Sequence, residues 1–223
     1  MSLQLINQHL QKLQQLLASQ PRPISVVGCD PGPEYSAFVE LTVGLDGYVH
    51  CDRAAYVSNE DLKAMHGGAT LGDSHLTTRK SFNTSPLVFA YERVSNQGRI
   101  VGKLVFDTCA ISGDICRHMR HDMRASAIMS FTPSRWRYII TGLGNAKDSE
   151  TRVALDDMAV SGLAETLSAA AKTAKREYAL TKSSLPHLRD AAGVALSVLL
   201  AWDKLGDDFN EHILWAKGER DAR

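Results

Sequence analysis

The pattern of apolar runs separated by polar residues predicts a sheet within residues 24–131. Several apolar runs are rich in β-branched and aromatic residues and end at glycine, proline or polar residues, as β-strands do. We expect strands at residues 24–27, 37–43, 48–57, 87–91 and 126–131. The first three are joined by short loops, so we predict that they pair antiparallel.

Apolar residues at helical spacing predict helices over much of the remaining chain. These helices cover residues 2–19, 98–121, 133–141, 148–171 and 187–203. The first either binds a partner or packs on the main domain, and the last is apolar enough to lie against the sheet. Residues 58–86 are predicted to be mostly loop with a helical turn or two, and residues 172–184 an exposed basic connection.

Composition and charge exclude several classes of protein. A length of 223 residues with 44% hydrophobic content suits one large domain. We expect no membrane span, because no apolar run reaches roughly 18 residues, and no secretory signal. Lys and Arg total 25, as do Asp and Glu, which argues against a generally basic nucleic-acid-binding protein but allows a local basic face. Four cysteines without a Cys-x-x-Cys pair favour a reducing, cytoplasmic compartment.

Acidic residues follow two of the predicted strands and recur near the start of the last helix. Asp30 ends the first strand before a Pro-Gly turn, and Glu92 ends the fourth. His187 and Asp190 are three positions apart, so they share one face of the last helix. If that helix lies against the sheet, its first turn faces the ends of both strands, and the four side chains converge.

Three carboxylates and an imidazole in a small space repel one another unless cations lie between them. Oxygen ligands suit Mg²⁺ or Mn²⁺, and an imidazole favours Mn²⁺. Two such ions can activate a water and stabilise the leaving oxygen of a phosphodiester. The pattern therefore points to metal-dependent phosphodiester chemistry.

With these motifs in this order, the sequence resembles the RuvC family of Holliday junction resolvases, within the ribonuclease H-like fold. The resemblance covers about residues 24–203. The residues that carry it are Gly28-Cys29-Asp30-Pro31-Gly32, Tyr91-Glu92, Thr132-Pro133-Ser134-Arg135-Trp136-Arg137, Thr141-Gly142-Leu143-Gly144-Asn145-Ala146-Lys147 and His187-Leu188-Arg189-Asp190-Ala191-Ala192. In that family the first acid lies in an Asp-Pro-Gly turn and the last two ligands are three apart, one of them sometimes His.

The resemblance implies an α/β fold with a mixed five-stranded sheet, three antiparallel strands followed by parallel strands, flanked by helices. The nuclease domain would span residues 23–205, between an N-terminal helical extension at 1–22 and a polar tail at 206–223. The N-terminal helix and the polar stretch at 58–86 are additions to the family pattern and resemble those of a viral or divergent member. We therefore expect the protein in the cytoplasm of a bacterial or virus-infected cell.

The resemblance also implies a homodimer, formed through the helix at residues 98–121, that nicks four-way junctions with two Mg²⁺ or Mn²⁺ ions per active site. Metal ligands and catalytic residues would be Asp30, Glu92, His187 and Asp190, with Asp30 bridging both ions. Candidate DNA contacts are Ser95, Asn96, Arg117, Arg120, Arg124, Arg135, Arg137 and Lys147. Ser95 stands where many bacterial members carry an aromatic wedge.

Other interpretations remain open from the sequence. Another nuclease of this fold could cut flaps, branched DNA or RNA–DNA hybrids, a non-catalytic scaffold could bind junctions, and actin-like ATPases or sugar kinases also begin with a strand that ends in Asp. Asp30 could simply cap a turn, and the arginines between residues 117 and 137 could form a solvated face. Trp136 is predicted to be a packing residue rather than a platform for base stacking.

Overall fold

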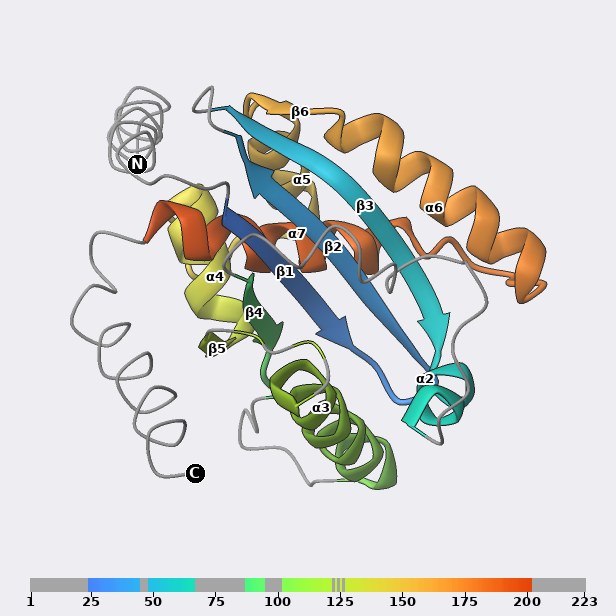
Figure 1. The fold of residues 1–223 in the computed structure, drawn as a ribbon. Coiled ribbons are helices and arrows are strands. Elements are labelled where there is room, and N and C mark those ends of the chain that lie inside the picture. Colours follow the sequence, from blue (N-terminus) through green and yellow to red (C-terminus); the bar gives the residue numbers. More distant parts are fainter. Residues whose placement is uncertain are drawn as a thin grey trace, which may run out of the picture.

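The computed structural model describes residues 24–44, 48–66, 87–94, 102–121, 123, 125 and 127–201. This part of the chain forms one mixed sheet with helices on both faces (Figure 1). Its strands are β1 (Ile24–Pro31), β2 (Tyr35–Val43), β3 (Val49–Ser58), β4 (Leu87–Glu92), β5 (Ala127–Phe131) and β6 (Val160–Ser161). In space their order is β5-β4-β1-β2-β3-β6.

The pairing of the strands confirms the predicted mixed sheet. β1 pairs antiparallel with β2, and β2 with β3. On the other side of β1, β4 and then β5 run parallel to it. β1 is therefore central, and both of its faces are covered: Val26 belongs to one hydrophobic core and Val27 to the other.

The sheet has six strands rather than the predicted five, and the sixth interrupts a predicted helix. In place of one helix over residues 148–171 there are α5 (Asp148–Asp156), the two-residue β6 and α6 (Leu163–Glu177). β6 pairs parallel with the start of β3. Gly162 then adopts a φ of 74°, a left-handed conformation that glycine tolerates, directly before α6. A strand of two residues is too short to show a periodicity of its own.

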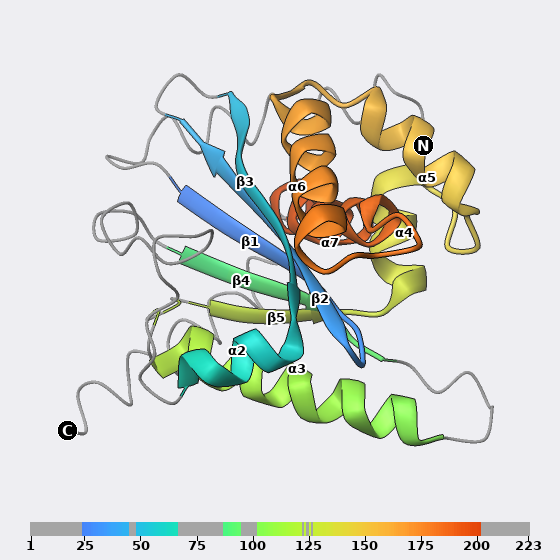
Figure 2. The same cartoon turned by 90° about the vertical axis from the view of Figure 1, so that its right-hand side faces the viewer.

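Helices cover the two faces of the sheet unequally (Figure 2). One face carries α2 (Asn59–His66) and α3 (Lys103–His121), and the other carries α4 (Pro133–Thr141), α5, α6 and α7 (Leu185–Leu200). From Ala191 to Leu200, every residue of α7 is buried. A Cβ on Gly28 of β1 would lie 2.1 Å from the backbone oxygen of Ala191, so the glycine permits α7 to contact the central strand closely.

Some of the predicted features lie outside the described residues. They are the N-terminal extension at 1–22, most of the predicted loop at 58–86, the tail at 206–223, and the individual residues Ser95, Asn96 and Arg124. Within the described residues, no helix combines the length and apolar character needed to cross a lipid bilayer.

Candidate active site

Asp30 and Glu92 end adjacent parallel strands at the same edge of the sheet. Cys29 of β1 pairs with Tyr91 of β4, so the next residues along the two strands lie side by side. Asn59, the first residue of α2, stabilises the turn that follows Asp30, because its Nδ2 donates to the Gly32 oxygen at 2.9 Å. Its Oδ1 accepts a 2.9 Å bond from Ser36 Oγ. The first carboxylate is therefore held on a rigid strand end.

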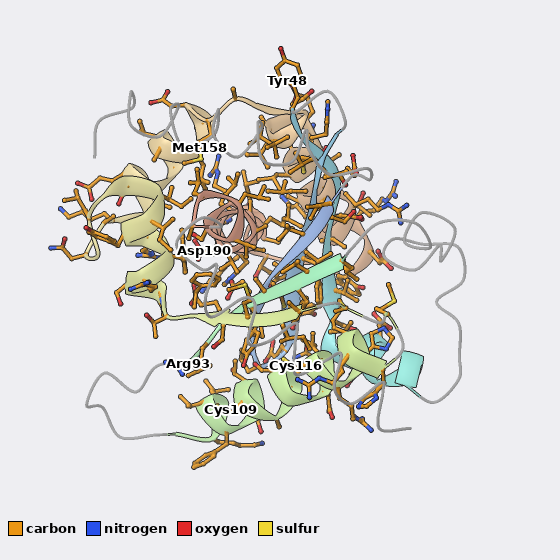
Figure 3. The ribbon with its side chains drawn as sticks, turned by 60° about the vertical axis from the view of Figure 1, so that its left-hand side comes forward. Tyr48, Arg93, Cys109, Cys116, Met158 and Asp190 are labelled. Atoms are coloured by element: carbon orange, nitrogen blue, oxygen red, sulfur yellow. The ribbon has the colours of Figure 1, made fainter. Side chains whose placement is uncertain are left out.

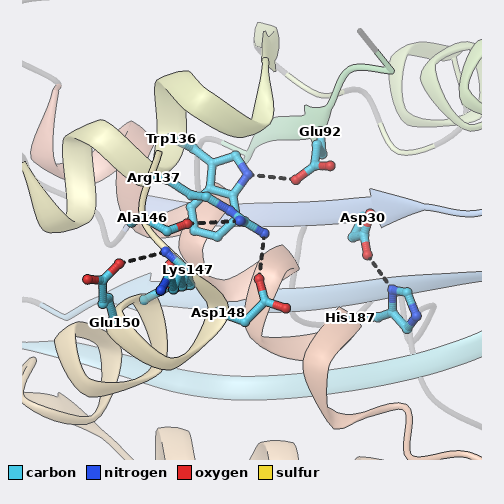
Figure 4. A network of polar contacts seen from close by, with 10 residues as sticks. Asp30, Glu92, Trp136, Arg137, Ala146, Lys147, Asp148, Glu150 and His187 are labelled. Carbon is cyan, nitrogen blue, oxygen red and sulfur yellow. Dashed lines mark hydrogen bonds and ion pairs between the residues drawn. The ribbon is translucent and has the colours of Figure 1, made fainter. Parts of the chain in front are cut away.

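His187, in the first turn of α7, reaches this edge from the helical layer. Its Nδ1 donates to Asp30 Oδ2 across 2.8 Å (Figure 4). The side chain of Asp30 is 13% exposed and that of His187 is 54% exposed. The hydrogen bond to Asp30 raises the pKa of His187, although burial opposes this. The predicted convergence of Asp30 and His187 is therefore observed as a direct contact.

A row of aromatic rings supports the His187 imidazole on its other side. Tyr56, near the end of β3, stacks on the imidazole with 5.7 Å between ring centroids and 24° between planes. Tyr35 stacks on Tyr56 at 5.4 Å, and Tyr178 lies tilted against Tyr35 at the same distance. The stacking on Tyr56 favours the ring orientation in which Nδ1 bonds to Asp30. No sequence pattern signals this role of Tyr56, because the contact joins β3 to α7.

Glu92 and Asp190 are both pushed towards their protonated forms. Burial raises the pKa of Glu92 to about 7, and the charge of Asp30 adds to the rise. Burial likewise raises the pKa of Asp190, on α7 where it meets the sheet (Figure 3), to about 7, with further contributions from Asp30 and Glu92. Because the charge of Asp30 raises the pKa of both Glu92 and Asp190, and the charge of Glu92 raises the pKa of Asp190, the three carboxylates lie within electrostatic range of one another.

Trp136, on α4, donates from Nε1 to Glu92 Oε2 across 2.6 Å (Figure 4). Its side chain is fully buried, which confirms that Trp136 is a packing residue. The hydrogen bond itself was not predicted. A buried indole needs an acceptor for its N–H, so a tryptophan predicted to be in the core could have prompted a search for one.

The chemistry of this donor set fits a divalent cation. Three carboxylates and one imidazole are hard or borderline ligands, and their mutual repulsion falls when a cation lies between them. In the arrangement observed, Asp30 contacts His187 and Glu92 contacts Trp136. Within the described residues, no three His, Cys, Asp or Glu side chains are close enough together to hold an ion as they stand.

Arg137 lies beside the carboxylates and has its own partners. Its guanidinium donates to the Ala146 oxygen at 3.1 Å, pairs with Asp148 at 3.0 Å and lies 5.3 Å from the centre of the Trp136 ring. Its positive charge lowers the pKa values of Glu92 and Asp190, against the larger effect of burial. The side chain is 23% exposed, so much of its surface is already covered.

The other basic residues that were predicted to contact DNA, and that the structure describes, are exposed and lie in two separate groups. Arg135 and Lys147 belong to the α4–α5 region, on the face of the sheet that α7 covers. Arg117 and Arg120 lie near the end of α3, on the other face. α3 ends shortly before β5 begins, whereas α4 starts directly after β5 ends, so the groups also lie at opposite ends of that strand.

The arrangement of strands and helices matches that of a solved structure. The structure of RuvC from Thermus thermophilus matches with a TM-score of 0.52 and 16% sequence identity, over 81% of this chain and 96% of that chain. This chain has the fold of RuvC. The predicted resemblance is thereby confirmed at the level of the fold, including the ribonuclease H-like sheet with three antiparallel strands followed by parallel strands.

Two further solved structures match less closely. T. thermophilus RuvC in complex with a Holliday junction substrate has a TM-score of 0.49 and 13% identity, over 81% of this chain and 96% of that chain. The yeast mitochondrial Holliday junction resolvase Ydc2 has a TM-score of 0.49 and 14% identity, over 93% of this chain and 90% of that chain. The sequence matches no protein-family model and no curated protein.

Proposed function

We propose that this protein is a member of the RuvC family that resolves four-way DNA junctions by paired nicks and depends on a divalent metal. The observation that carries the proposal is the position of Asp30 and Glu92 at the ends of adjacent parallel strands, with His187 bonded to Asp30 from α7. These elements occur in a chain that has the RuvC fold.

Four residues would hold the metal ions and carry the chemistry. Asp30 would contact both ions, and Glu92 and Asp190 one each, while His187 completes one site or orients the attacking water. Bound Mg²⁺ or Mn²⁺ would activate that water and stabilise the leaving oxygen of the phosphodiester. Tyr56 stacks on His187, and Trp136 donates a hydrogen bond to Glu92.

Substrate binding would rely on cations near this edge and on a second copy of the chain. Arg135 and Lys147 are exposed in the α4–α5 region, which also carries Trp136 and Arg137, and suit contacts to phosphates. On α3, the side chains of Leu104 and Phe106 are 63% and 65% exposed, which supports the expected homodimer through this helix. Two subunits would supply two active sites, one for each nick.

The proposal is tested by cleavage of a labelled mobile four-way junction beside linear duplex, a flap and an RNA–DNA hybrid. Each substrate is incubated with Mg²⁺, Mn²⁺ or EDTA. We expect paired nicks in opposing strands of the junction, dependent on metal, with the duplex spared. Faster cleavage of the flap or hybrid would assign the site to another nuclease activity of this fold. Tight junction binding without cleavage would identify a scaffold.

A further inference from the structure

The indole of Trp136 is held in a single position beside Glu92. Its ring lies in the core between α4 and α7, with no exposed surface. A Cβ on Gly193 of α7 would lie 2.5 Å from the indole Cζ3, so the ring occupies the space that any larger residue would need. On the same helix, Ser197 Oγ donates to the Gly193 oxygen at 2.8 Å and also lies 3.4 Å from the Trp136 backbone oxygen. Neither the ring nor its backbone can shift without disturbing α7.

The position of the indole determines how the Glu92 carboxylate is presented. An indole N–H can only donate, and at 2.6 Å its bond to Glu92 Oε2 is short, as charge-assisted bonds are. One oxygen of the carboxylate is thereby fixed, so the remaining oxygen has one direction relative to the strand end. Groups that orient a ligand in this way typically change metal affinity by about 10- to 100-fold when they are removed.

We propose that Trp136 is a positioning residue for the metal site, acting through its hydrogen bond to Glu92, and that Gly193 provides the space this requires. The inference rests on the proposed function, because it assigns Glu92 as a metal ligand. It adds a residue that contacts neither metal nor DNA. Trp136 thereby connects the core between α4 and α7 to the catalytic edge of the sheet.

The test compares Trp136→Phe with Ile140→Val. Trp136→Phe removes the donor but keeps an aromatic ring in the core, whereas Ile140→Val creates a small defect elsewhere on α4, where Ile140 is fully buried. Binding of Mg²⁺ is measured by isothermal titration calorimetry on the full chain, and folding by the thermal unfolding midpoint. We expect Trp136→Phe to weaken Mg²⁺ binding by about 10-fold or more. Ile140→Val should lower the midpoint and leave Mg²⁺ affinity unchanged.

A spectroscopic measurement reports the hydrogen bond directly. In a ¹⁵N–¹H correlation spectrum, the Trp136 indole peak is the one lost in Trp136→Phe. We expect this peak to move when Glu92 is replaced by Leu, and to move when Mg²⁺ is added to the unaltered protein. Gly193→Ala retains the indole but displaces it, so it should shift the same peak and weaken Mg²⁺ binding.

The outcomes separate this inference from the function on which it rests. If the unaltered protein binds Mg²⁺ and Trp136→Phe binds it equally well, the positioning role is wrong and the proposed function stands. If Trp136→Phe and Ile140→Val weaken binding to the same degree, Trp136 acts only through stability, and the inference is overturned. An unaltered protein that binds neither Mg²⁺ nor Mn²⁺ would overturn both.

Discussion

His187 Nδ1 lies 2.8 Å from Asp30 Oδ2, although the two residues are 157 positions apart in the chain. This contact joins the first turn of α7 to the end of the central strand. It places an imidazole against the carboxylate that the proposed function assigns to both metal ions. A change to either residue, or to the side chains that support them, should therefore alter cleavage.

Replacing Asp30 by Asn should abolish junction cleavage and leave junction binding largely intact. The substitution removes a charge but keeps the shape of the side chain, and Asn Oδ1 can still accept the bond from His187. Cleavage rates and binding by gel shift in Ca²⁺ measure the two effects separately. A variant that loses binding together with cleavage would contradict the role assigned to Asp30.

Tyr56 should influence cleavage through its stacking on His187. Aromatic pairs of this kind contribute roughly 0.5–1.5 kcal/mol, so Tyr56→Leu should slow cleavage by about 2- to 10-fold. Tyr56→Phe keeps the ring and should retain the rate, which makes it the matched control. Equal rates for the Leu and Phe variants under single-turnover conditions would show that stacking does not matter.

The metal-free protein should become less stable as the pH rises from about 4 to above 7. Glu92 and Asp190 have pKa values of about 7 in the folded state, against ordinary values of 4.5 and 3.8. Between these limits the folded state holds more protons than the unfolded state, so rising pH favours unfolding. The raised pKa of His187 acts in the same direction, because its stabilising effect is lost as the pH rises through that value.

The measurement is denaturant unfolding in EDTA at pH 5 and pH 8. The double variant Glu92→Gln, Asp190→Asn should show a clearly smaller loss of stability between the two pH values. Added Mg²⁺ should restore more stability at pH 8 than at pH 5, because the ligands are then deprotonated. An unaltered protein whose pH dependence matches that of the double variant would contradict the assignment.

Arg135 and Arg137 should respond differently to replacement by Met, although only one residue separates them. Arg137 is bonded to Ala146 and Asp148, so its loss should lower the free energy of unfolding by about 1–2 kcal/mol. Arg135 is exposed, and its loss should leave stability unchanged. Arg135→Met should instead weaken junction binding and reduce its salt dependence by about one phosphate contact. Denaturant unfolding and salt-dependent gel shifts distinguish these results.

Two glycine-to-alanine substitutions should change stability in opposite directions. Gly28→Ala places a Cβ 2.1 Å from a backbone oxygen of α7, and the helix backbone would have to shift to make room for it. We therefore expect the free energy of unfolding to fall by about 3 kcal/mol. Gly113 lies within α3, and a Cβ added there would meet no described atom within 4 Å. Gly113→Ala should raise stability by about 0.5–1 kcal/mol, because alanine favours a helix. Both are measured by denaturant unfolding.

Much of the fold could be predicted from the sequence because the hydrophobic pattern of most segments matches the position that each segment takes in the sheet or in the helical layers. The runs that become β1 and β4 are nearly continuous and apolar, since helices cover both faces of the sheet at these strands. The acids at positions 30 and 92 stand out because each directly follows such a run. The predicted helix over residues 148–171 was wrong because its spacing continues across residues 157–162, where the chain bends into β6.

Local patterns were enough to locate β1 to β5, the helix that carries His187 and Asp190, and the chain order that resembles RuvC. The partners of individual groups became known only from the three-dimensional packing: the indole of Trp136 with Glu92, the ring of Tyr56 with His187, and Arg137 with Asp148. The packing also places α3 and α4, which carry predicted arginines, on opposite faces of the sheet. Periodicity reports the environment of one segment, whereas these contacts depend on how α4 and α7 pack together across β1 and β4.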